Sequence, residues 1–224
     1  TADNQLYIPG SSIKGMLRTI LMNNAIFEAE DKKWIKDEIK NCGTNPKFFG
    51  EQIEKRIFRF GRNLKDAKYD LMKFIHVTDT NTVPVEQAGR IAFPELYYNS
   101  GKNESAPLPF EAIKEDVEFE ARITIDVDGL KAVSKNKDKK QWINFDEKIK
   151  NLFGIDTDFL RTNSFKNIED DFKEFIYDAI EAFSGAIINK EVYWSFKNQN
   201  VGLNKKYESF PNNSVKLGWA SSFP

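Results

Sequence analysis

The chain has 224 residues, 40% of them hydrophobic, which is enough to bury one sizeable core or two small ones. Its net charge of −1 excludes a uniformly basic nucleic-acid binder. Residues 1–75 carry 14 basic and 10 acidic side chains, while residues 76–224 carry 19 and 24, so a polyanion, if one binds, is expected along the N-terminal part. The absence of a run of about 18 apolar residues excludes a membrane-spanning helix, and the single cysteine, Cys42, excludes an internal disulfide and fits a reducing cytoplasm.

The first predicted element is an amphipathic helix that follows a Pro9-Gly10 turn. Apolar residues recur from Ile13 onward with helical spacing, which predicts a helix to roughly Phe27. Ser11 or Ser12 is expected to be its N-cap, because serine hydroxyls accept hydrogen bonds from the first free N–H groups of a helix.

Two cations follow the serines on the polar side of this helix. Lys14 and Arg18 are four residues apart, and Gly15 lies between them, where a side chain would obstruct an approaching backbone. Hydroxyls, backbone N–H groups and cations in one stretch suit a phosphate backbone. The alternative is an ordinary capped helix with solvated Lys and Arg.

A second helix is predicted at Lys32–Lys40, and a basic segment follows at Lys55–Lys68. This segment holds one acid among six cations, and Phe58 and Phe60 are interleaved with them. We favour a solvated face. The alternative is a basic flap on which Phe58 or Phe60 stacks against an unstacked base.

The middle of the chain is predicted to contain short strands. Leu71–Val77 is expected to be a strand with its turn at Thr78–Asn81, and Arg90–Tyr98 a strand broken by Pro94. Asn99–Pro109 is rich in turn-forming residues and is predicted to be a loop.

The clearest strand pattern is Val117–Asp128, where apolar and polar residues alternate, as in a half-buried antiparallel strand. A lysine-rich connector is expected at Lys135–Lys140. The spacing of apolar residues from Ile168 to Phe183 predicts a long helix that stops near Gly185.

Two further strands are predicted, at Tyr193–Phe196 and Val215–Trp219. Helices and strands are mixed without the spacing of a dinucleotide-binding βαβ unit, so the predicted fold class is α+β with an antiparallel sheet. The small polar turn after Gly218 and Trp219 would let a backbone approach closely.

The sequence carries no convincing catalytic set and predicts no cofactor. His76 is the single histidine, so a Cys/His zinc cluster or a multi-histidine site is excluded. Asp79, Asp126 and Asp128 are candidate Mg²⁺ ligands, but a solvated role is favoured for them. Neither a Walker loop nor a Gly-x-Gly-x-x-Gly motif is present.

The stretch Tyr7–Arg18 resembles the signature of the RAMP superfamily of CRISPR proteins. Supporting stretches are Phe74–Thr80, Phe119–Asp126 and Lys216–Trp219, so the resemblance extends over most of the chain. Within the superfamily, the order of features is similar to that of the subunit-five family of type III-A Csm effector complexes.

The resemblance implies an RNA-binding subunit on a ferredoxin-like (RRM-like) core. Such a subunit would cap the 3′ end of the guide RNA (crRNA), and support its maturation and complex assembly in antiviral defence. It would pack against the repeated backbone RAMP subunit and the small helical subunit, with target RNA as a further candidate partner. Cutting of target RNA resembles the task of the backbone subunit, so this chain is expected not to be an enzyme.

The chain departs from the family pattern at both ends. The family's first strand should precede Thr1, and the expected glycine-rich loop is replaced by Ala220-Ser221-Ser222. We therefore expect residues 1–224 to be a RAMP-type module from a longer chain that lacks its first strand, with a second subdomain over about residues 111–224.

The residues expected to bind RNA are those of the first turn, the basic segment and the C-terminal turn: Gly10, Ser11, Ser12, Ile13, Lys14, Arg18, Arg56, Arg59, Arg62, Gly218 and Trp219. Three alternatives stay open. The chain could be an endoribonuclease of the same superfamily that uses His76 or Asp79, another type III backbone subunit, or an adaptor that contacts only proteins.

Overall fold

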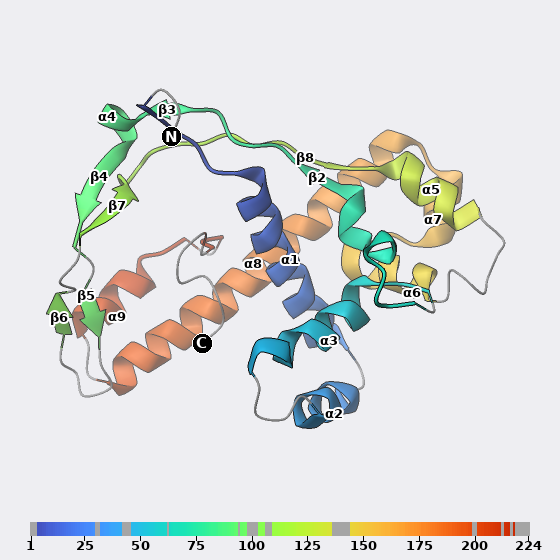
Figure 1. The fold of residues 1–224 in the computed structure, drawn as a ribbon, viewed down its shortest axis with the longest axis horizontal. Coiled ribbons are helices and arrows are strands. Elements are labelled where there is room, and N and C mark those ends of the chain that lie inside the picture. The colour runs from blue at the N-terminus through green and yellow to red at the C-terminus, as the bar shows by residue number, and fades with distance from the viewer. Residues whose placement is uncertain are drawn as a thin grey trace. The chain divides into compact units, whose positions relative to one another are not determined.

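The computed structural model describes residues 4–29, 32–41, 46–61, 63–93, 95–97, 103–105, 109–135, 144–198, 201–211, 213–215 and 217. The chain forms two compact units, each assembled from separate stretches. Unit 1 comprises Thr1–Ile13, Val77–Arg122 and Ser184–Pro224, and unit 2 comprises Lys14–His76 and Ile123–Phe183. Helices are mixed with short two-stranded sheets (Figure 1), which confirms the predicted mixture of helix and strand. The expected subdomain from about residue 111 stays a prediction.

Unit 2 is largely helical. Its helices are α1 (Gly10–Glu28), α2 (Lys33–Asn41), α3 (Pro46–Phe58), α5 (Val127–Lys135), α6 (Phe145–Phe153), α7 (Thr157–Thr162) and α8 (Phe165–Lys197), with the start of α1 and the end of α8 assigned to unit 1. Two 3-10 turns, η2 (Ala67–Tyr69) and η3 (Leu71–Phe74), precede β2 (Ile75–Val77), which pairs with β8 (Ile123–Ile125). The two predicted N-terminal helices are confirmed.

The core of unit 2 is built from aromatic and aliphatic side chains. Leu17, Ile20 and Leu21 of α1 are fully buried, as their helical spacing predicts. Phe58 and Phe60 are buried as well, and the Phe60 ring meets Phe145 edge to face at 4.9 Å. The interpretation of Phe58 or Phe60 as base-stacking groups is therefore wrong, because neither ring is exposed to solvent.

Unit 1 consists mainly of short strand pairs. The pairs are β1 (Gln5–Leu6) with β3 (Val83–Pro84), β4 (Gly89–Ala92) with β7 (Phe110–Ile113), and β5 (Glu95–Tyr97) with β6 (Asn103–Ser105), all antiparallel. The predicted interruption of Arg90–Tyr98 is confirmed by the division into β4 and β5. The prediction of a loop over Asn99–Pro109 is wrong at Asn103–Ser105, which form the strand β6.

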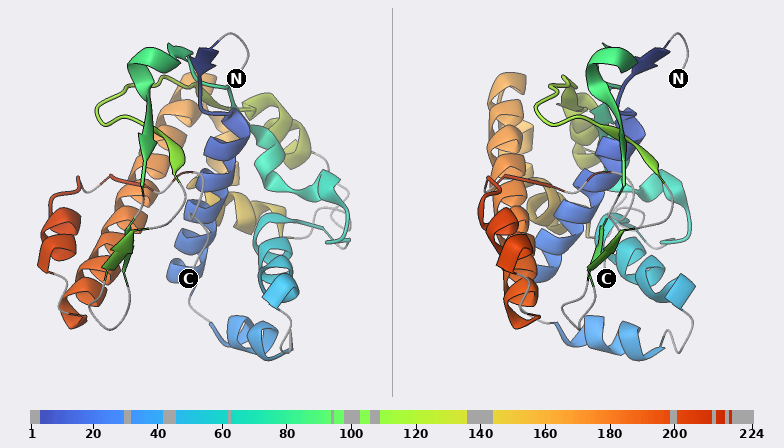
Figure 2. Two further views of the ribbon diagram at one scale, coloured as in Figure 1. Left: turned by 60° about the vertical axis from the view of Figure 1, so that its left-hand side comes forward. Right: turned by 90° about the vertical axis from the view of Figure 1, so that its left-hand side faces the viewer.

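Unit 1 also contains α4 (Val85–Ala88), α9 (Val201–Glu208) and the end of α8. Asn204 of α9 donates from its amide to the carbonyl of Val192 at 3.2 Å and to the hydroxyl of Ser195 at 3.3 Å. These bonds hold α9 beside the end of α8 in both views of Figure 2. Ser195 is buried, so the two helices share a buried polar contact.

The predicted strand Val117–Asp128 is confirmed only at β8. The N–H groups of Arg122 and Glu120 donate to side-chain oxygens, Oγ1 of Thr78 (3.0 Å) and Oδ1 of Asn81 (2.7 Å), so that side chains replace the backbone carbonyls of a regular ladder. Past β8, the Asp126 carboxylate accepts the N–H of Gly129 at 2.8 Å and starts α5.

Of two other strand predictions, Tyr193–Phe196 is wrong, and Leu71–Val77 is wrong in its first part and confirmed at β2 (Ile75–Val77). Tyr193–Phe196 lies in α8, which continues through Gly185 without a turn. Leu71–Phe74 is the 3-10 turn η3, which Asp70 caps by accepting the N–H of Met72 at 2.9 Å. Most of the predicted connector Lys135–Lys140 and of the strand Val215–Trp219 lies outside the described residues.

Candidate nucleic-acid interface

In unit 1, the turn before α1 is held by the loop Thr78–Asn81. The N–H of Ile8 donates to Oγ1 of Thr80 at 2.9 Å, and the N–H of Thr80 returns a bond to the carbonyl of Ile8 at 3.1 Å. Thr80 is only 8% exposed. Reciprocal bonds around a buried threonine fix the position of the chain where α1 begins.

Gly10 is the first residue of α1, and its N–H donates to Oδ1 of Asp79 at 2.7 Å. A Cβ atom at this position would lie 2.6–2.7 Å from the backbone of Val77 and Thr78. Only glycine permits this approach. The carboxylate of Asp79 therefore satisfies the positive end of the α1 dipole.

Ser11 and Ser12 lie inside the first turn of α1, so the expectation that one of them is the N-cap is wrong. The carboxylate of Asp79 takes that task, and the carbonyl of Pro9 accepts the N–H of Ser12 at 2.9 Å. Ser11 is exposed and Ser12 half-buried. Within the described residues, neither hydroxyl forms a hydrogen bond, so both remain available to a ligand.

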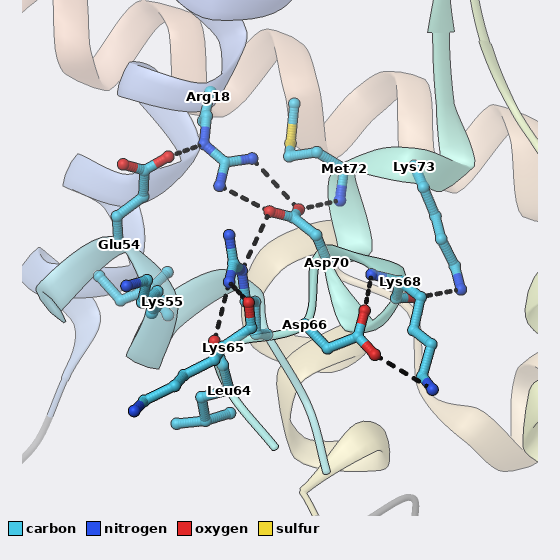
Figure 3. Close-up of polar contacts among 12 residues, drawn as sticks. Arg18, Glu54, Lys55, Leu64, Lys65, Asp66, Lys68, Asp70, Met72 and Lys73 are labelled. Carbon is cyan, nitrogen blue, oxygen red and sulfur yellow. Dashed lines mark hydrogen bonds and ion pairs between the residues drawn. The ribbon is translucent and has the colours of Figure 1, made fainter. Parts of the chain in front are cut away.

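In unit 2, both cations of α1 contact protein atoms. The ammonium of Lys14 donates to the carbonyl of Ile75 at 2.7 Å. The guanidinium of Arg18 forms an ion pair with Glu54 and binds Asp70 through two nitrogens, at 2.7 and 3.2 Å (Figure 3). It also lies 4.2 Å from the centre of the Phe58 ring.

Asp70 is the centre of this network. Besides Arg18 and the N–H of Met72, its carboxylate faces Arg59, whose Nε lies 3.8 Å away. Arg59 also donates through Nη1 to the carbonyls of Leu64 (2.8 Å) and Lys65 (3.0 Å), which fixes the segment after α3. One carboxylate therefore joins α1, the residue after α3 and η3, and Figure 3 shows Asp70 between Arg18 and Met72.

The ionisation of Arg18 reflects this environment. Burial alone would lower its pKa, but the hydrogen bonds and charges of Asp70 and Glu54 outweigh burial and raise the pKa. Arg18 and Arg59 together face Asp70 and Glu54, so the cluster has no net charge. The predicted phosphate contact of Arg18 stays a prediction, and its observed contacts stabilise unit 2.

Arg56 lies differently from Arg18, because its side chain is half exposed. Its guanidinium lies 4.5 Å from the centre of the Trp34 ring on α2 and 3.8 Å from Glu38. Arg56, Trp34 and Glu38 all line a cavity of about 830 Å³, together with further residues of α3 and α6. The sequence prediction missed Trp34, although a tryptophan on the short amphipathic α2 was a usable signal.

Lys148 of α6 lines the same cavity and was also missed. Its ammonium donates to the carbonyls of Arg56 and, at 3.3 Å, of Ile57, at the C-terminal end of α3. Burial lowers the pKa of Lys148 to about 8; Glu147 opposes this shift and Arg56 adds to it. The role of Lys148 depends on its contact with the end of α3, which is distant in the sequence, so no local pattern could have identified it.

Of the remaining predicted residues, the structure describes one. Ile13 is half-buried, and Arg62, Gly218 and Trp219 lie outside the described residues. His76 is exposed on β2. Within the described ranges, no three His, Cys, Asp or Glu side chains lie close enough to share a metal ion. None of the described helices is both long and apolar enough to cross a membrane.

Comparison with known proteins identifies relatives along nearly the whole chain. The RAMP superfamily model matches residues 1–207. The "CRISPR system Cms protein Csm5" of Streptococcus thermophilus is 32% identical over 128 residues, which cover 55% of this chain and 32% of that protein.

Two solved structures share the fold. The crystal structure of T. onnurineus Csm5 has a TM-score of 0.56 at 19% identity, over 99% of this chain and 63% of that one. A chain of the cryo-EM structure of a Csm-crRNA-target RNA ternary complex in a type III-A CRISPR-Cas system has a TM-score of 0.63 at 18% identity, over 99% and 59%. The chain thus spans about a third of the curated relative and about three fifths of the two structural relatives.

Proposed function

Because this chain belongs to the RAMP superfamily, we propose that it binds guide RNA (crRNA) as a subunit of a type III-A Csm effector complex in antiviral defence. The relatives named Csm5 and the Csm-crRNA-target RNA complex support this proposal. We assign it the end of the complex at which the 3′ end of the guide is capped, with a role in guide maturation and assembly.

The proposal includes a ferredoxin-like core and a set of neighbours in the cytoplasm. The backbone RAMP subunit, the small helical subunit and target RNA are the partners, and the chain itself is a non-catalytic, RNA-binding subunit that needs no cofactor. A guide must be held whatever its sequence, and contacts to phosphates and sugars do this without reading bases.

In unit 1, the observation that carries the proposal is the pair of unused hydroxyls of Ser11 and Ser12. The bonds between Ile8 and Thr80 and between Gly10 and Asp79 fix their backbone, so little entropy is lost when RNA binds. Hydroxyls donate to phosphate oxygens and accept from ribose hydroxyls. The carboxylate of Asp79 already occupies the N–H of Gly10, so the serine side chains are proposed as the contacts.

In unit 2, Lys14 is proposed as the phosphate contact of α1. An ammonium has three donors, and the carbonyl of Ile75 uses one of them, which leaves the charge uncompensated. Arg18 instead faces two carboxylates. Lys14 is therefore expected to contribute more to RNA binding than Arg18, although both carry one positive charge.

The test is filter binding of guide RNA over a range of salt concentrations. Lys14→Ala should weaken binding of all guide sequences equally and reduce the slope of log K against log salt by about 0.7, the value for one phosphate contact on a single strand. Lys166→Ala removes an exposed lysine of α8 and is the control. Equal slopes for wild type and Lys14→Ala would contradict the assignment.

The non-catalytic role has its own test. The purified chain, incubated with labelled RNA with and without Mg²⁺, should leave the RNA intact. If it cleaves RNA, and His76→Ala or Asp79→Asn stops cleavage while RNA stays bound, the endoribonuclease alternative is correct. Co-purification of the tagged chain with Csm subunits and guide RNA tests the assembly, and capture of proteins without RNA would support the adaptor alternative.

A further inference from the structure

Unit 2 contains a cavity that the guide-RNA proposal does not use. It has a volume of about 830 Å³ and lies among α2, α3, α6 and the end of α1. Cavities of roughly 300–1,000 Å³ bind small molecules. We propose that this cavity binds a nucleoside monophosphate, either free or as the terminal nucleotide of an RNA strand.

The first argument is a flat surface at the cavity wall. The guanidinium of Arg56 lies 4.5 Å from the Trp34 ring centre, so that an indole and a planar cation are held together. Both groups stack on nucleobases, and such stacking contributes roughly 1–3 kcal/mol per base. Glu38 lies 3.8 Å from Arg56, too far for a hydrogen bond that would fix the guanidinium.

The second argument is the charge of the lining. Of the four cations in the lining, Lys55 is paired with Glu51, Arg56 faces Glu38 and Arg59 faces Asp70, so Lys148 is the lining cation for which the described residues give no ion pair. The ammonium of Lys148 is fixed by the main-chain carbonyls of Arg56 and Ile57 rather than by a carboxylate. Its positive charge is thus uncompensated by an ion pair, and a phosphate group would supply the missing negative charge.

The third argument is a set of side-chain amides. The exposed residues Gln52, Asn144 and Asn151 line the cavity, and their amides form no hydrogen bond within the described residues. Asn144 stands before α6 in the left-handed region, with φ 64°, yet its side chain does not cap the helix. An amide offers both a donor and an acceptor, as the edges of bases and ribose hydroxyls require.

The occupant follows from these three groups together. A carbohydrate would use the amides but not the cations, and a simple anion would use the cations but not the indole. A nucleoside monophosphate uses all three. The inference deepens the proposed function only if an RNA end is the source, since a free nucleotide would bind independently of the guide.

The experiment measures binding of 5′-AMP, a linear RNA pentamer and a circular RNA of matching composition to the whole chain. Trp34→Ala and Arg56→Gln should each lower the affinity for the ligand tenfold or more. Trp34→Phe should keep most of the affinity, because an aromatic ring remains. Arg90→Gln is the control, since Arg90 is an exposed, ion-paired arginine of unit 1. Circular dichroism checks that each variant folds.

The outcomes separate the two sources. Trp34-dependent binding of 5′-AMP identifies a free nucleotide, and Trp34-dependent binding of linear but not circular RNA identifies an RNA end. Equal binding by wild type and Trp34→Ala for all three ligands overturns the inference, as does Trp34-dependent binding of circular RNA equal to that of linear RNA. Guide RNA is titrated in the same samples: if it binds but Trp34 has no effect, the inference fails while the guide-RNA proposal stands.

Discussion

The two units of the chain are stabilised in different ways. Unit 2 buries side chains from α1, α3, α5, α6, α7 and α8, including Phe58, Phe60 and Phe153 at 0% exposure. In the described part of unit 1, Ala88 is the one buried hydrophobic residue, and Ile91, Phe93 and Phe196 are 62–75% exposed. Unit 1 depends on hydrogen bonds between short strand pairs, which are marginal in water without a packed face. We therefore expect unit 1 to be the less stable unit until it binds a partner.

The largest expected effect tests the core of unit 2. Phe153→Ala removes a fully buried ring that meets Phe172 edge to face at 5.7 Å, and should lower the free energy of unfolding by about 3–5 kcal/mol. Phe196→Ala in unit 1 removes a ring that is 75% exposed, and should change it by less than about 0.5 kcal/mol. Urea unfolding followed by circular dichroism measures both. Similar losses for the two variants would contradict the comparison.

The next largest effect concerns Lys148 of unit 2, a partly buried lysine. The pKa of Lys148 is about 8, below the unfolded value of about 10.4. Between these values the unfolded chain binds the proton that the folded chain lacks, so stability should rise from pH 8 to above pH 10, by up to roughly 3 kcal/mol. Below pH 8 this contribution is constant.

The control for Lys148 lies in unit 1. Lys114 also donates to a main-chain carbonyl, that of Glu86 at 2.7 Å, but its side chain is exposed. Urea midpoints from pH 7 to 10.5 should show the rise in wild type and in Lys114→Gln, and a flatter profile in Lys148→Gln. A profile that Lys148→Gln leaves unchanged would show that other groups cause the rise.

The sequence predicted the helices of unit 2 better than the strands of unit 1. Apolar spacing identified Leu17, Ile20 and Leu21, because one helix face packs against one core. The prediction of a strand over Val117–Asp128 failed outside β8. Alternation of apolar and polar residues does not show whether the N–H groups of a segment donate to backbone carbonyls or, as here, to the side chains of Thr78 and Asn81.

Caps explain two of the remaining errors. The carboxylates of Asp70 and Asp126 each start a helical turn in or beside a stretch that was predicted to be a strand. At the candidate interface, the sequence identified Lys14 and Arg18 but not Asp70, which lies 52 residues beyond Arg18. Asp70 binds Arg18 and not Lys14, and this difference gives the two cations different proposed roles. A long-range ion pair has no local pattern, so it could not be predicted from spacing.

Gly10 tests a tightly packed point of unit 1, at the start of α1. Gly10→Ala places a methyl group 2.6–2.7 Å from the backbone of Val77 and Thr78, and no flexible side chain can give way there. We expect a loss of about 1–3 kcal/mol, as for overpacking in a core. Thermal unfolding measures it, and full stability of Gly10→Ala would mean that the loop Thr78–Asn81 does not hold this turn.

Gly15 is the glycine of α1 that lies in unit 2, and its substitution is expected to change stability less than that of Gly10. No atom lies within 4 Å of a Cβ built at this exposed helical position, so Gly15→Ala should stabilise the chain by about 0.5–1 kcal/mol through helix propensity alone. If Gly15 is retained so that a guide backbone can approach α1, the same variant should bind guide RNA more weakly, despite its higher stability. The opposite signs distinguish a functional glycine from a structural one: a variant that is more stable and binds RNA as well as wild type would remove α1 of unit 2 from the proposed RNA path.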